Sequence, residues 1–362
     1  MHILSYTPSF FLMTLISTAH MSVDALNALL EKEYTTKLTK HDRKLFRGTA
    51  VEVFPDMTDQ GILDSAHANF DVLTTPVQFT TDHGMQTSAD KLVWYRNDNS
   101  QQLGVFGTRR TAIQPSDFIR YFRTFCSQSE KAITLDVVGT LNEGRVFYMG
   151  SKLTGDNISD KIGGTEGFGI SRNIPEEDRS DFWLVLTDYY GESKAPKAQL
   201  LINSLVCDNG MTRKVDQKLC SLTHLRQQSS SDVHAVLRQA LREQEIYYKL
   251  QDRMMDVKVS RELAEQALKA FCKDYEGETR KYKTLVDIYD NKLIGGHLDS
   301  RKGTAWGLVN TVTQYTSRTS TNQDSAMRSQ LHGTRGADPQ KFMQQLASQF
   351  DEMSPIRELV TA

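Results

Sequence analysis

The spacing of apolar residues changes near residue 215, and this change constrains the fold of the chain more than any single motif. From Lys44 to Leu153 the chain has short runs rich in Val, Thr, Phe and Tyr, a composition typical of β-strands. After Val215 the apolar residues recur at helical spacing almost to Asn291. The sequence therefore predicts an α+β fold, with a sheet built first and a long helical region in the C-terminal half.

Strand-like runs and turn residues together predict a curved antiparallel β-sheet with packed helices on one face. The predicted strands are residues 45–54, 92–95, 103–113, 133–140, 145–153, 181–190 and 197–206. Leu141-Asn142-Glu143-Gly144 has the composition of a hairpin turn, and Gly191 to Pro196 that of a second turn. Short connections of this kind favour antiparallel neighbours.

Three segments outside the helical region also have helical patterns. Ser22 starts an amphipathic segment that runs to about Leu38. Pro115-Ser116-Asp117 begins a second helix, in which Phe118, Tyr121, Phe122 and Phe125 fall on one side. A last helix over 339–350 would dock through Phe342, Leu346 and Phe350.

Length and pattern together divide the chain into four segments. With 362 residues, the chain is long enough for one large domain with a helical insertion or for two associated domains. Phe10 to Ile16 is a short apolar run with no Lys or Arg before it, so it fits neither a secretory signal nor a membrane span. We expect a dispensable extension at 1–21, sheet and helices at 22–214, a helical hairpin or insertion at 215–300, and C-terminal helices with a basic segment at 301–362.

The composition is that of a cytoplasmic globular protein. Hydrophobic residues make up 39% of the chain and charged residues 24%, which excludes a disordered or fibrous chain. The four cysteines lie far apart with no C-x-x-C pair, so we expect reduced thiols and neither a zinc ribbon nor a thioredoxin-type motif. The formal net charge of -2 excludes a surface that is basic all over.

The sequence carries no signature of catalysis. The histidines are scattered and form no H-E-x-x-H or H-x-H pair, and the sequence offers no recognisable signature of a nucleophile with its base. The loop Lys161 to Gly169 is rich in glycine but lacks the Gly-Lys-Ser/Thr ending of a phosphate-binding loop. We therefore expect no metal and no cofactor, although ionisable groups that converge only in three dimensions leave an enzyme open as a third reading.

A protein that binds single-stranded nucleic acid needs cations along the phosphates and aromatic faces for the bases, and this chain has both. Arg109 and Arg110 follow Phe106 in a strand-like run, where alternation would place one arginine on each face. Arg145 shares a face with Phe147, although an ordinary exposed arginine over a core ring fits as well. The DNA-binding candidates are Arg109, Arg110, Arg145, Arg213, Lys214, Arg301, Lys302, Arg318 and Arg335.

Two further segments carry a family resemblance. Val206-Cys207-Asp208-Asn209-Gly210-Met211-Thr212 and the helix from Gly303 to Tyr315 resemble the phage/plasmid-like protein family, whose domain is of unknown function. The resemblance spans most of residues 90–350. The matching positions are Asn209, Gly303, Trp306, Asn310, Thr313 and Tyr315. The chain departs from the commonest pattern at 208–210 and at Gln314, and a structural role explains the landmarks without any function: a turn at 209–210, and a buried Asn310 bonded to nearby backbone.

The resemblance implies a mobile-element protein. Single-strand annealing proteins of such elements look similar in general plan, with a curved antiparallel sheet, helices, ring or filament assembly and no catalytic constellation. This is an analogy of architecture and setting. The sequence thus predicts a cytoplasmic protein that binds single-stranded DNA and promotes annealing or recombination as a homo-oligomer. The alternative is a regulatory or host-interaction module without DNA binding.

Overall fold

The computed structural model describes most of the chain from residue 38 onward. The described residues are 38, 40–129, 133–153, 174, 178–194, 196–204, 210–214, 230–318, 327–328, 331 and 338–349. The chain divides into two compact units, Met1–Thr39 and Lys40–Ala362. The elements described belong to the second unit. The predicted extension at 1–21 and the helix predicted to begin at Ser22 lie outside the described residues, as does the glycine-rich loop from Lys161 to Gly169.

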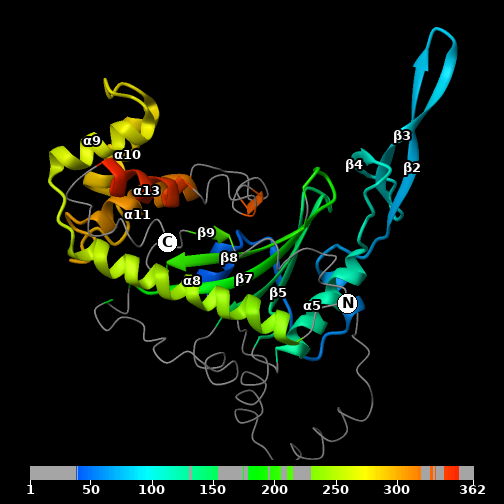
Figure 1. The fold of residues 1–362 in the computed structure, drawn as a ribbon, viewed down its shortest axis with the longest axis horizontal. Coiled ribbons are helices and arrows are strands. Elements are labelled where there is room, and N and C mark those ends of the chain that lie inside the picture. Colours follow the sequence, from blue (N-terminus) through cyan, green and yellow to red (C-terminus); the bar gives the residue numbers. More distant parts are fainter. Residues whose placement is uncertain are drawn as a thin grey trace, which may run out of the picture. The chain divides into compact units, whose positions relative to one another are not determined.

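The second unit is built on a six-stranded antiparallel sheet, in the order β1-β5-β6-β7-β8-β9 (Figure 1). Its strands are β1 (Ala50–Glu52), β5 (Val137–Leu141), β6 (Val146–Leu153), β7 (Ser180–Tyr189), β8 (Lys197–Ser204) and β9 (Gly210–Lys214). Asn142, Glu143 and Gly144 all have positive φ and form the predicted turn between β5 and β6. The prediction of an antiparallel sheet in an α+β fold is confirmed.

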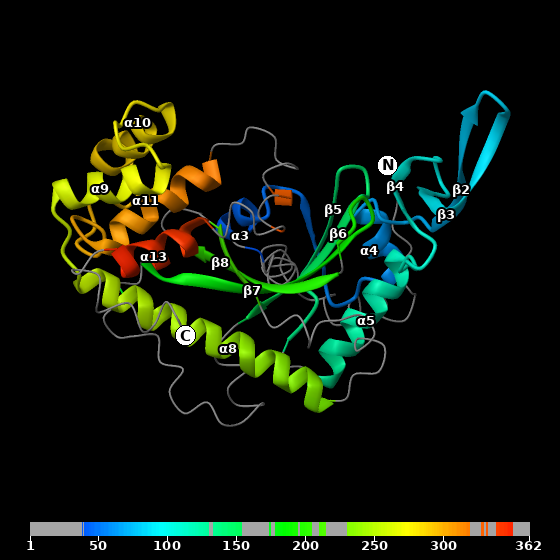
Figure 2. The same cartoon turned by 45° about the horizontal axis from the view of Figure 1, so that its top comes forward.

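Two helices pack against one face of this sheet. In α5 (Pro115–Gln128) the predicted aromatic side is confirmed, since Phe118, Phe122 and Phe125 are buried. The long helix α8 (Ser230–Asp256) runs along β7 (Figure 2) and places the rings of Tyr247 and Tyr248 within 5.5 Å and 5.2 Å of Phe182. Burial of these apolar side chains holds the helices on the sheet.

The opposite face is covered near β6 and β7 by the helix α3 (Lys40–Leu45) and by Phe46. The Phe46 ring stacks on Tyr148 at 6.0 Å and meets Trp183 edge-on at 4.9 Å. The predicted strand at 45–54 is therefore wrong in its first half. The backbone turns at Arg47 and Gly48, both with positive φ, and β1 begins only at Ala50.

The C-terminal helices form a second packed layer. They are α9 (Arg261–Cys272), α10 (Arg280–Asp287), a π-helical turn over Ile288–Lys292, α11 (Ala305–Arg318) and α13 (Asp338–Gln349). Phe342 and Leu346 of α13 are buried as predicted, and Phe350 lies outside the described residues. Tyr247 of α8 contacts Trp306 of α11, and all these elements belong to one unit. The segment boundaries predicted at 215 and 301 stay predictions.

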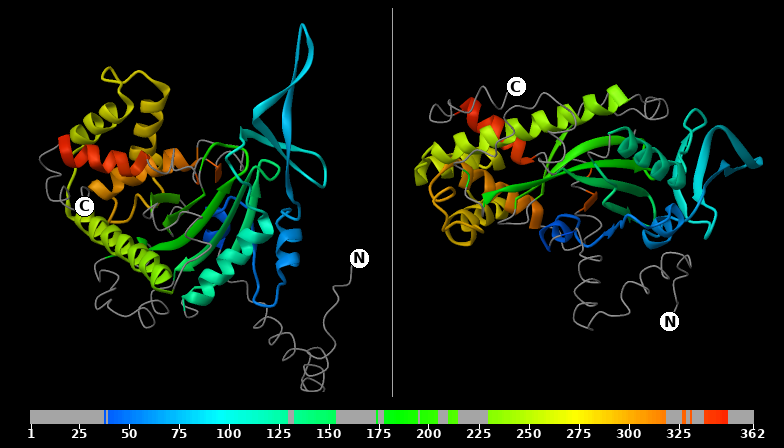
Figure 3. Two further views of the ribbon diagram at one scale, coloured as in Figure 1. Left: turned by 45° about the vertical axis from the view of Figure 1, so that its right-hand side comes forward. Right: turned by 90° about the horizontal axis from the view of Figure 1, so that it is seen from below.

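A small three-stranded sheet of β2 (Val72–Thr81), β3 (Gly84–Arg96) and β4 (Gln102–Gly107) stands beside the large one. The strand β4 pairs only with residues 91–95 of β3. Beyond that, β2 and β3 continue as a two-stranded arm, which Figure 3 shows extending past β4. The strand predicted at 103–113 ends at Gly107, because the chain turns at Thr108 and Arg109.

Short helix α4 (Asp59–Ser65) completes the junction between the sheets. Its first turn is capped by the Thr58 side chain, which accepts a hydrogen bond from the Gly61 N–H. Arg123 of α5 donates to the Met57 carbonyl just ahead of it. These bonds hold the chain that leads from β1 into the small sheet.

Candidate functional site

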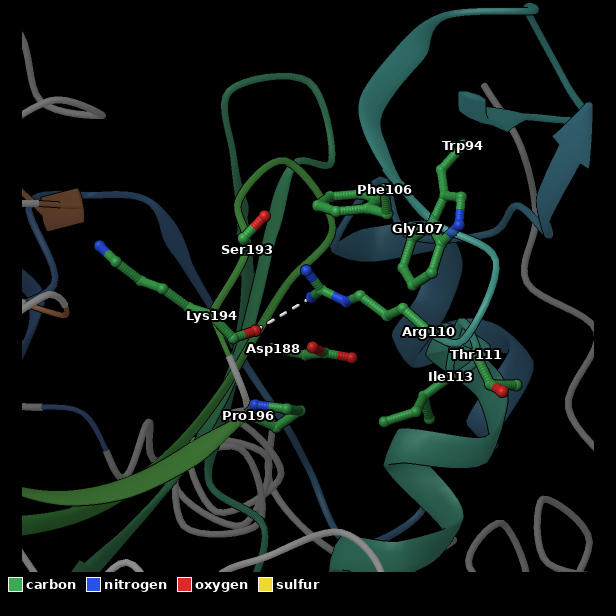
Figure 4. A pocket seen from close by; sticks show the side chains of 10 residues that line it. All are labelled: Trp94, Phe106, Gly107, Arg110, Thr111, Ile113, Asp188, Ser193, Lys194 and Pro196. Atoms are coloured by element: carbon green, nitrogen blue, oxygen red, sulfur yellow. Dashed lines mark hydrogen bonds between the residues drawn. The ribbon is translucent and has the colours of Figure 1, made fainter. Parts of the chain in front are cut away.

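A cavity of about 390 Å³ lies where the end of β4 and the segment after it face the turn between β7 and β8. Trp94 and Phe106 form one wall, and Ile113 with Pro196 adds apolar surface. The charged side chains of Arg110 and Asp188 line the rest, while Lys194 contributes its backbone carbonyl and extends its side chain away from the cavity (Figure 4). A concave, mostly apolar site with a few converging polar groups is the usual form of a binding site for small ligands.

The aromatic wall follows from the register of β3 and β4. The rings of Trp94 and Phe106 lie 4.6 Å apart at an interplanar angle of 60°, an edge-on contact that aromatic pairs prefer. Gly104, opposite Trp94, makes this possible because a Cβ there would come within 2.6 Å of the Phe106 ring. Trp94 is only 1% exposed, so its ring is packed into the wall.

Arg110 crosses the cavity and ties the two sheets together. Its guanidinium carbon lies 4.2 Å from the centroid of the Phe106 ring and 4.9 Å from that of Trp94. The same guanidinium donates to the carbonyl oxygens of Tyr189 and Lys194, at 2.7 and 3.0 Å, and to that of Glu192. Burial lowers the pKa of Arg110 somewhat, and the nearby Asp188 charge opposes this shift. The side chain is therefore held in one plane.

Asp188 faces the same cavity from β7. It is 2% exposed, and its Oδ1 accepts a hydrogen bond of 2.7 Å from the Tyr189 N–H. Burial raises the pKa of Asp188 to about 6, while that hydrogen bond and the charge of Arg110 pull it down. Within the described part of the chain, this is the one hydrogen bond that the carboxylate receives. A buried carboxylate with spare acceptor capacity is costly without a ligand.

Further cations lie near the turn between β7 and β8. The Arg145 stem packs against Gly191, and its guanidinium donates to the Gln102 carbonyl at 3.3 Å. The amines of Lys194 and Lys197 lie 5.6 and 5.8 Å from the Tyr189 ring centroid. Glu192 pairs with Lys194 at 2.8 Å and partly offsets this positive charge. Arg109 is exposed on the turn after β4.

Three of the predicted DNA-binding residues thus come together at this junction, although not as expected. Arg109 and Arg110 lie in a turn, not a strand, so the prediction that they point to opposite sheet faces is wrong. Arg145 precedes β6, which is an inner strand between β5 and β7. Phe147, predicted beside Arg145, is buried against Phe118.

The prediction that Arg301 contacts phosphate is wrong. The Arg301 side chain is fully buried, and its Nε and Nη2 donate to Oδ1 of Asp178, the Nε at 3.0 Å. A third nitrogen, Nη1, donates to the Ile294 carbonyl at 2.9 Å. These bonds leave the guanidinium no path to a phosphate outside the protein. The neighbouring Lys302 is exposed, far along the chain from the cavity-lining residues.

The remaining cation candidates are located only in part. Arg213 and Lys214 lie on β9 and Arg318 ends α11, but only the backbone of these residues is described. Arg335 lies outside the described residues, and so does the landmark Asn209. They stay predictions.

The other family landmarks have structural roles. Gly303 has a φ of 62°, which suits glycine at the turn into α11. Trp306 donates from Nε1 to Oδ2 of Asp178 at 2.9 Å, and Asn310 donates to the Trp306 carbonyl at 2.9 Å, as the hypothesis of a backbone-bonded asparagine required. Thr313 bonds to the Val309 carbonyl, and Tyr315 is half-buried.

Asp188 was missed at the level of sequence, although a signal existed. Along β7, the alternate residues Phe182, Leu184 and Leu186 point into the core shared with α5 and α8, and Asp188 is next in that series. An acid in a core-facing position of a strand marks either a paired charge or a site. Among the described residues, no group of three or more His, Cys, Asp and Glu is placed to hold a metal.

Comparison with known proteins identifies a family, but no individual curated protein or solved structure. A family model described as "Domain of unknown function (DUF932)" matches residues 102–347, which is more than half of the chain. No curated protein and no solved structure matches it. None of the helices in the described part of the chain is long and apolar enough to span a membrane.

Proposed function

The chain belongs to the DUF932 family, and we propose that it is a cytoplasmic single-stranded DNA-binding protein of a mobile element that promotes annealing as a homo-oligomer. The observation that carries the proposal is that Arg110 enters an aromatic-lined cavity, while the exposed cations Arg109, Arg145 and Lys194 lie on or against the neighbouring turns. Cations beside stacking surfaces are what a single strand requires of a protein that does no chemistry on it.

The cations around the cavity have different roles in this proposal. The Arg110 guanidinium donates hydrogen bonds to three backbone carbonyls, so its main role is to shape the site and not to neutralise phosphate. Arg109 and Arg145 are exposed and reach solvent, and Lys194 extends from the turn between β7 and β8. These three side chains are the phosphate contacts, and they carry no information about base sequence.

Few phosphates are neutralised by such a site, so binding by one protomer is modest and sensitive to salt. Three contacts to a single strand give a slope of about -2 for the logarithm of the binding constant against the logarithm of salt concentration. Assembly of several protomers along one strand then supplies the affinity that a single copy lacks.

The test compares charge reversal at the cavity with charge reversal elsewhere. Arg109→Glu combined with Arg145→Glu should weaken binding to a fluorescent thirty-nucleotide oligo-dT at least tenfold and flatten the salt slope, as measured by anisotropy. Lys302→Glu, another exposed cation nominated by the sequence, is the matched control and should bind as the wild type does. Loss of binding in the control alone would move the site to the start of α11 and overturn the proposal.

A second candidate function is supported by the β2–β3 arm. Phe79 lies opposite Gln86 and Met85 opposite Thr80, close to the tip of the arm, and these two apolar side chains are 50% and 68% exposed. Apolar side chains on a projecting hairpin suit a protein partner rather than a phosphate backbone. Phe79→Ser with Met85→Ser separates the two candidates, because it should leave DNA binding by a single protomer unchanged and abolish capture of a protein partner.

A further inference from the structure

We propose that the cavity between Arg110 and Asp188 binds a single guanine base of the bound strand, recognised through the two neighbouring N–H donors on its Watson–Crick edge. This inference rests on the proposed binding of single-stranded DNA and adds a base preference to it. Phosphate binding by Arg109, Arg145 and Lys194 would not by itself need a ligand in the cavity, and this inference supplies one.

The size of the cavity suits one base. At about 390 Å³ it lies near the lower end of the ~300 to 1,000 Å³ range of small-ligand pockets. That is room for a base and part of its sugar. Proteins that read single strands commonly take an unstacked base into such a pocket and read its Watson–Crick edge.

The polar group that selects the ligand is the carboxylate of Asp188. It is almost fully buried and accepts one hydrogen bond from the residues that the structure describes, the one from the Tyr189 N–H, so most of its acceptor capacity faces the cavity. An ionised carboxylate accepts two parallel N–H bonds well. Guanine offers two N–H donors side by side, at N1 and at the 2-amino group, and so meets the carboxylate with both.

The other bases match this carboxylate less well. Adenine and cytosine each present one amino group next to a bare ring nitrogen, which repels a carboxylate. Thymine presents one N–H between two carbonyl oxygens. Leaving a buried polar group unpaired is the main source of discrimination between similar ligands. The preference for guanine therefore comes from the 2-amino group together with N1–H.

The planar surface for the base is the Arg110 guanidinium. Its bonds to the carbonyls of Tyr189, Glu192 and Lys194 fix the plane, and Phe106 backs it at 4.2 Å. Figure 4 shows Arg110 and Asp188 entering the cavity from facing walls, so one ligand can stack on the first and bond to the second. Bases stack on arginine planes in single-strand recognition.

The experiment uses oligo-dT of thirty nucleotides and the same strand with one central dG or one central deoxyinosine. Deoxyinosine keeps N1–H and lacks the 2-amino group. Anisotropy with wild-type protein should show binding about tenfold tighter for the dG strand than for oligo-dT, and a smaller gain for the deoxyinosine strand. Asp188→Asn should remove the gain while still binding oligo-dT, because the amide presents donors of its own.

A second variant guards against misfolding of the first. Arg110→Lys keeps the charge and loses the planar surface, so it should also reduce the gain for the dG strand. Thermal unfolding of each variant checks that it is folded. If both variants fold and both keep the full preference for dG, the inference is overturned.

The outcomes for the wild type separate this inference from the proposed function. Equal, salt-dependent binding of all three strands would overturn the guanine inference and leave DNA binding standing. A third outcome is that no strand binds, while guanosine raises the melting temperature of the wild type and not that of Asp188→Asn. This result would support recognition of guanine and show that the guanine does not come from a DNA strand. No binding and no shift would overturn both.

Discussion

Two clusters in this protein each combine a buried Asp with an Arg and a Trp. They differ in how many hydrogen bonds the Asp carboxylate accepts. Behind α11, Asp178 accepts from Ser300, Trp306 and two nitrogens of Arg301. At the cavity, Asp188 accepts from one backbone N–H, while Arg110 and Trp94 make their contacts elsewhere. The first cluster is closed, and the second leaves a charged acceptor facing the cavity.

The comparison shows how to tell a structural polar cluster from a binding site. A buried charge is tolerated where every partner is present, and the four donors around Asp178 satisfy that condition. A buried acid that keeps free acceptors destabilises the fold, and such a defect is expected where a ligand completes the set. Exposure alone does not separate the two, since both acids are almost fully buried.

Removing the closed cluster's acid should have the largest effect. Asp178→Ala leaves the fully buried Arg301 without its counter-charge, and we expect the free energy of unfolding to fall by about 3 to 5 kcal/mol. Urea unfolding followed by circular dichroism measures this. Asp290→Ala, which breaks an exposed ion pair with Arg261, is the control and should cost about 1 kcal/mol or less. Similar losses in both variants would contradict the view that Asp178 completes a buried network.

Neutralising Asp188, the acid of the cluster at the cavity, should have the opposite effect and stabilise the protein. The folded-state pKa of Asp188, about 6, lies above its ordinary value of 3.8, so ionisation of this group opposes folding increasingly as pH rises from about 4 to about 6. The free energy of unfolding of Asp188→Asn should therefore exceed that of the wild type by about 3 kcal/mol at pH 8 and by about 1 kcal/mol at pH 4.5. The groups facing this carboxylate are the Arg110 charge and the Tyr189 N–H, and both remain in the variant.

Urea titrations of wild type and Asp188→Asn at the two pH values test this difference. A gap between the two proteins that does not change with pH would show that Asp188 is not held in its buried, uncompensated state. A gap that reverses sign would show that another cation pairs with it in solution.

Adding a methyl group at Gly307, where α11 passes close to the Arg301 backbone, should have a smaller effect on stability. A Cβ at Gly307 would lie 1.9 Å from the Arg301 carbonyl oxygen, so Gly307→Ala forces α11 away from the loop before it. We expect a loss of about 1 to 3 kcal/mol in the free energy of unfolding. At Gly107, beside the cavity, the nearest atom to an added Cβ is 3.8 Å away, and Gly107→Ala should cost about 0.5 kcal/mol or less. Equal losses would mean that α11 shifts without strain.

Changes to the arm should have the least effect on stability. Phe79 and Met85 lie outside the core, so Phe79→Ser with Met85→Ser should change the free energy of unfolding by about 0.5 kcal/mol or less. Thermal unfolding measures the stability, and sedimentation velocity measures the assembly state in the same samples. A large loss of stability would show that the arm packs against another part of its own chain.

The sequence predicted those elements whose side chains serve one core. The strands β6, β7 and β8 and the helices α5, α11 and α13 were expected within a few residues, because burial imposes a period on them. The strand β2 and the part of β3 before Leu92 were not predicted, since most of their side chains are exposed on both faces and no apolar alternation is needed. The helix α3 was misassigned because six residues are too few to show a helical period.

The site was less predictable than the fold. Arg109, Arg110 and Arg145 were nominated as cations near aromatic residues, and the fold does bring them to one junction. Arg301 was nominated for the same reason and proved to be buried, because its partner Asp178 lies 123 positions earlier in the chain. Charge composition reveals which side chains are cationic and not which of them meet an acid inside the protein.

The arm also affects how the sequence of this protein can change over time. Between Gln78 and Thr87 the two strands pair only with each other, and no residue of this stretch is buried. Mutations there escape the selection that acts on folding, so the surface of the arm can diverge quickly between relatives. A lineage can in this way acquire a new partner while the sheets, and the cavity between them, stay as they are.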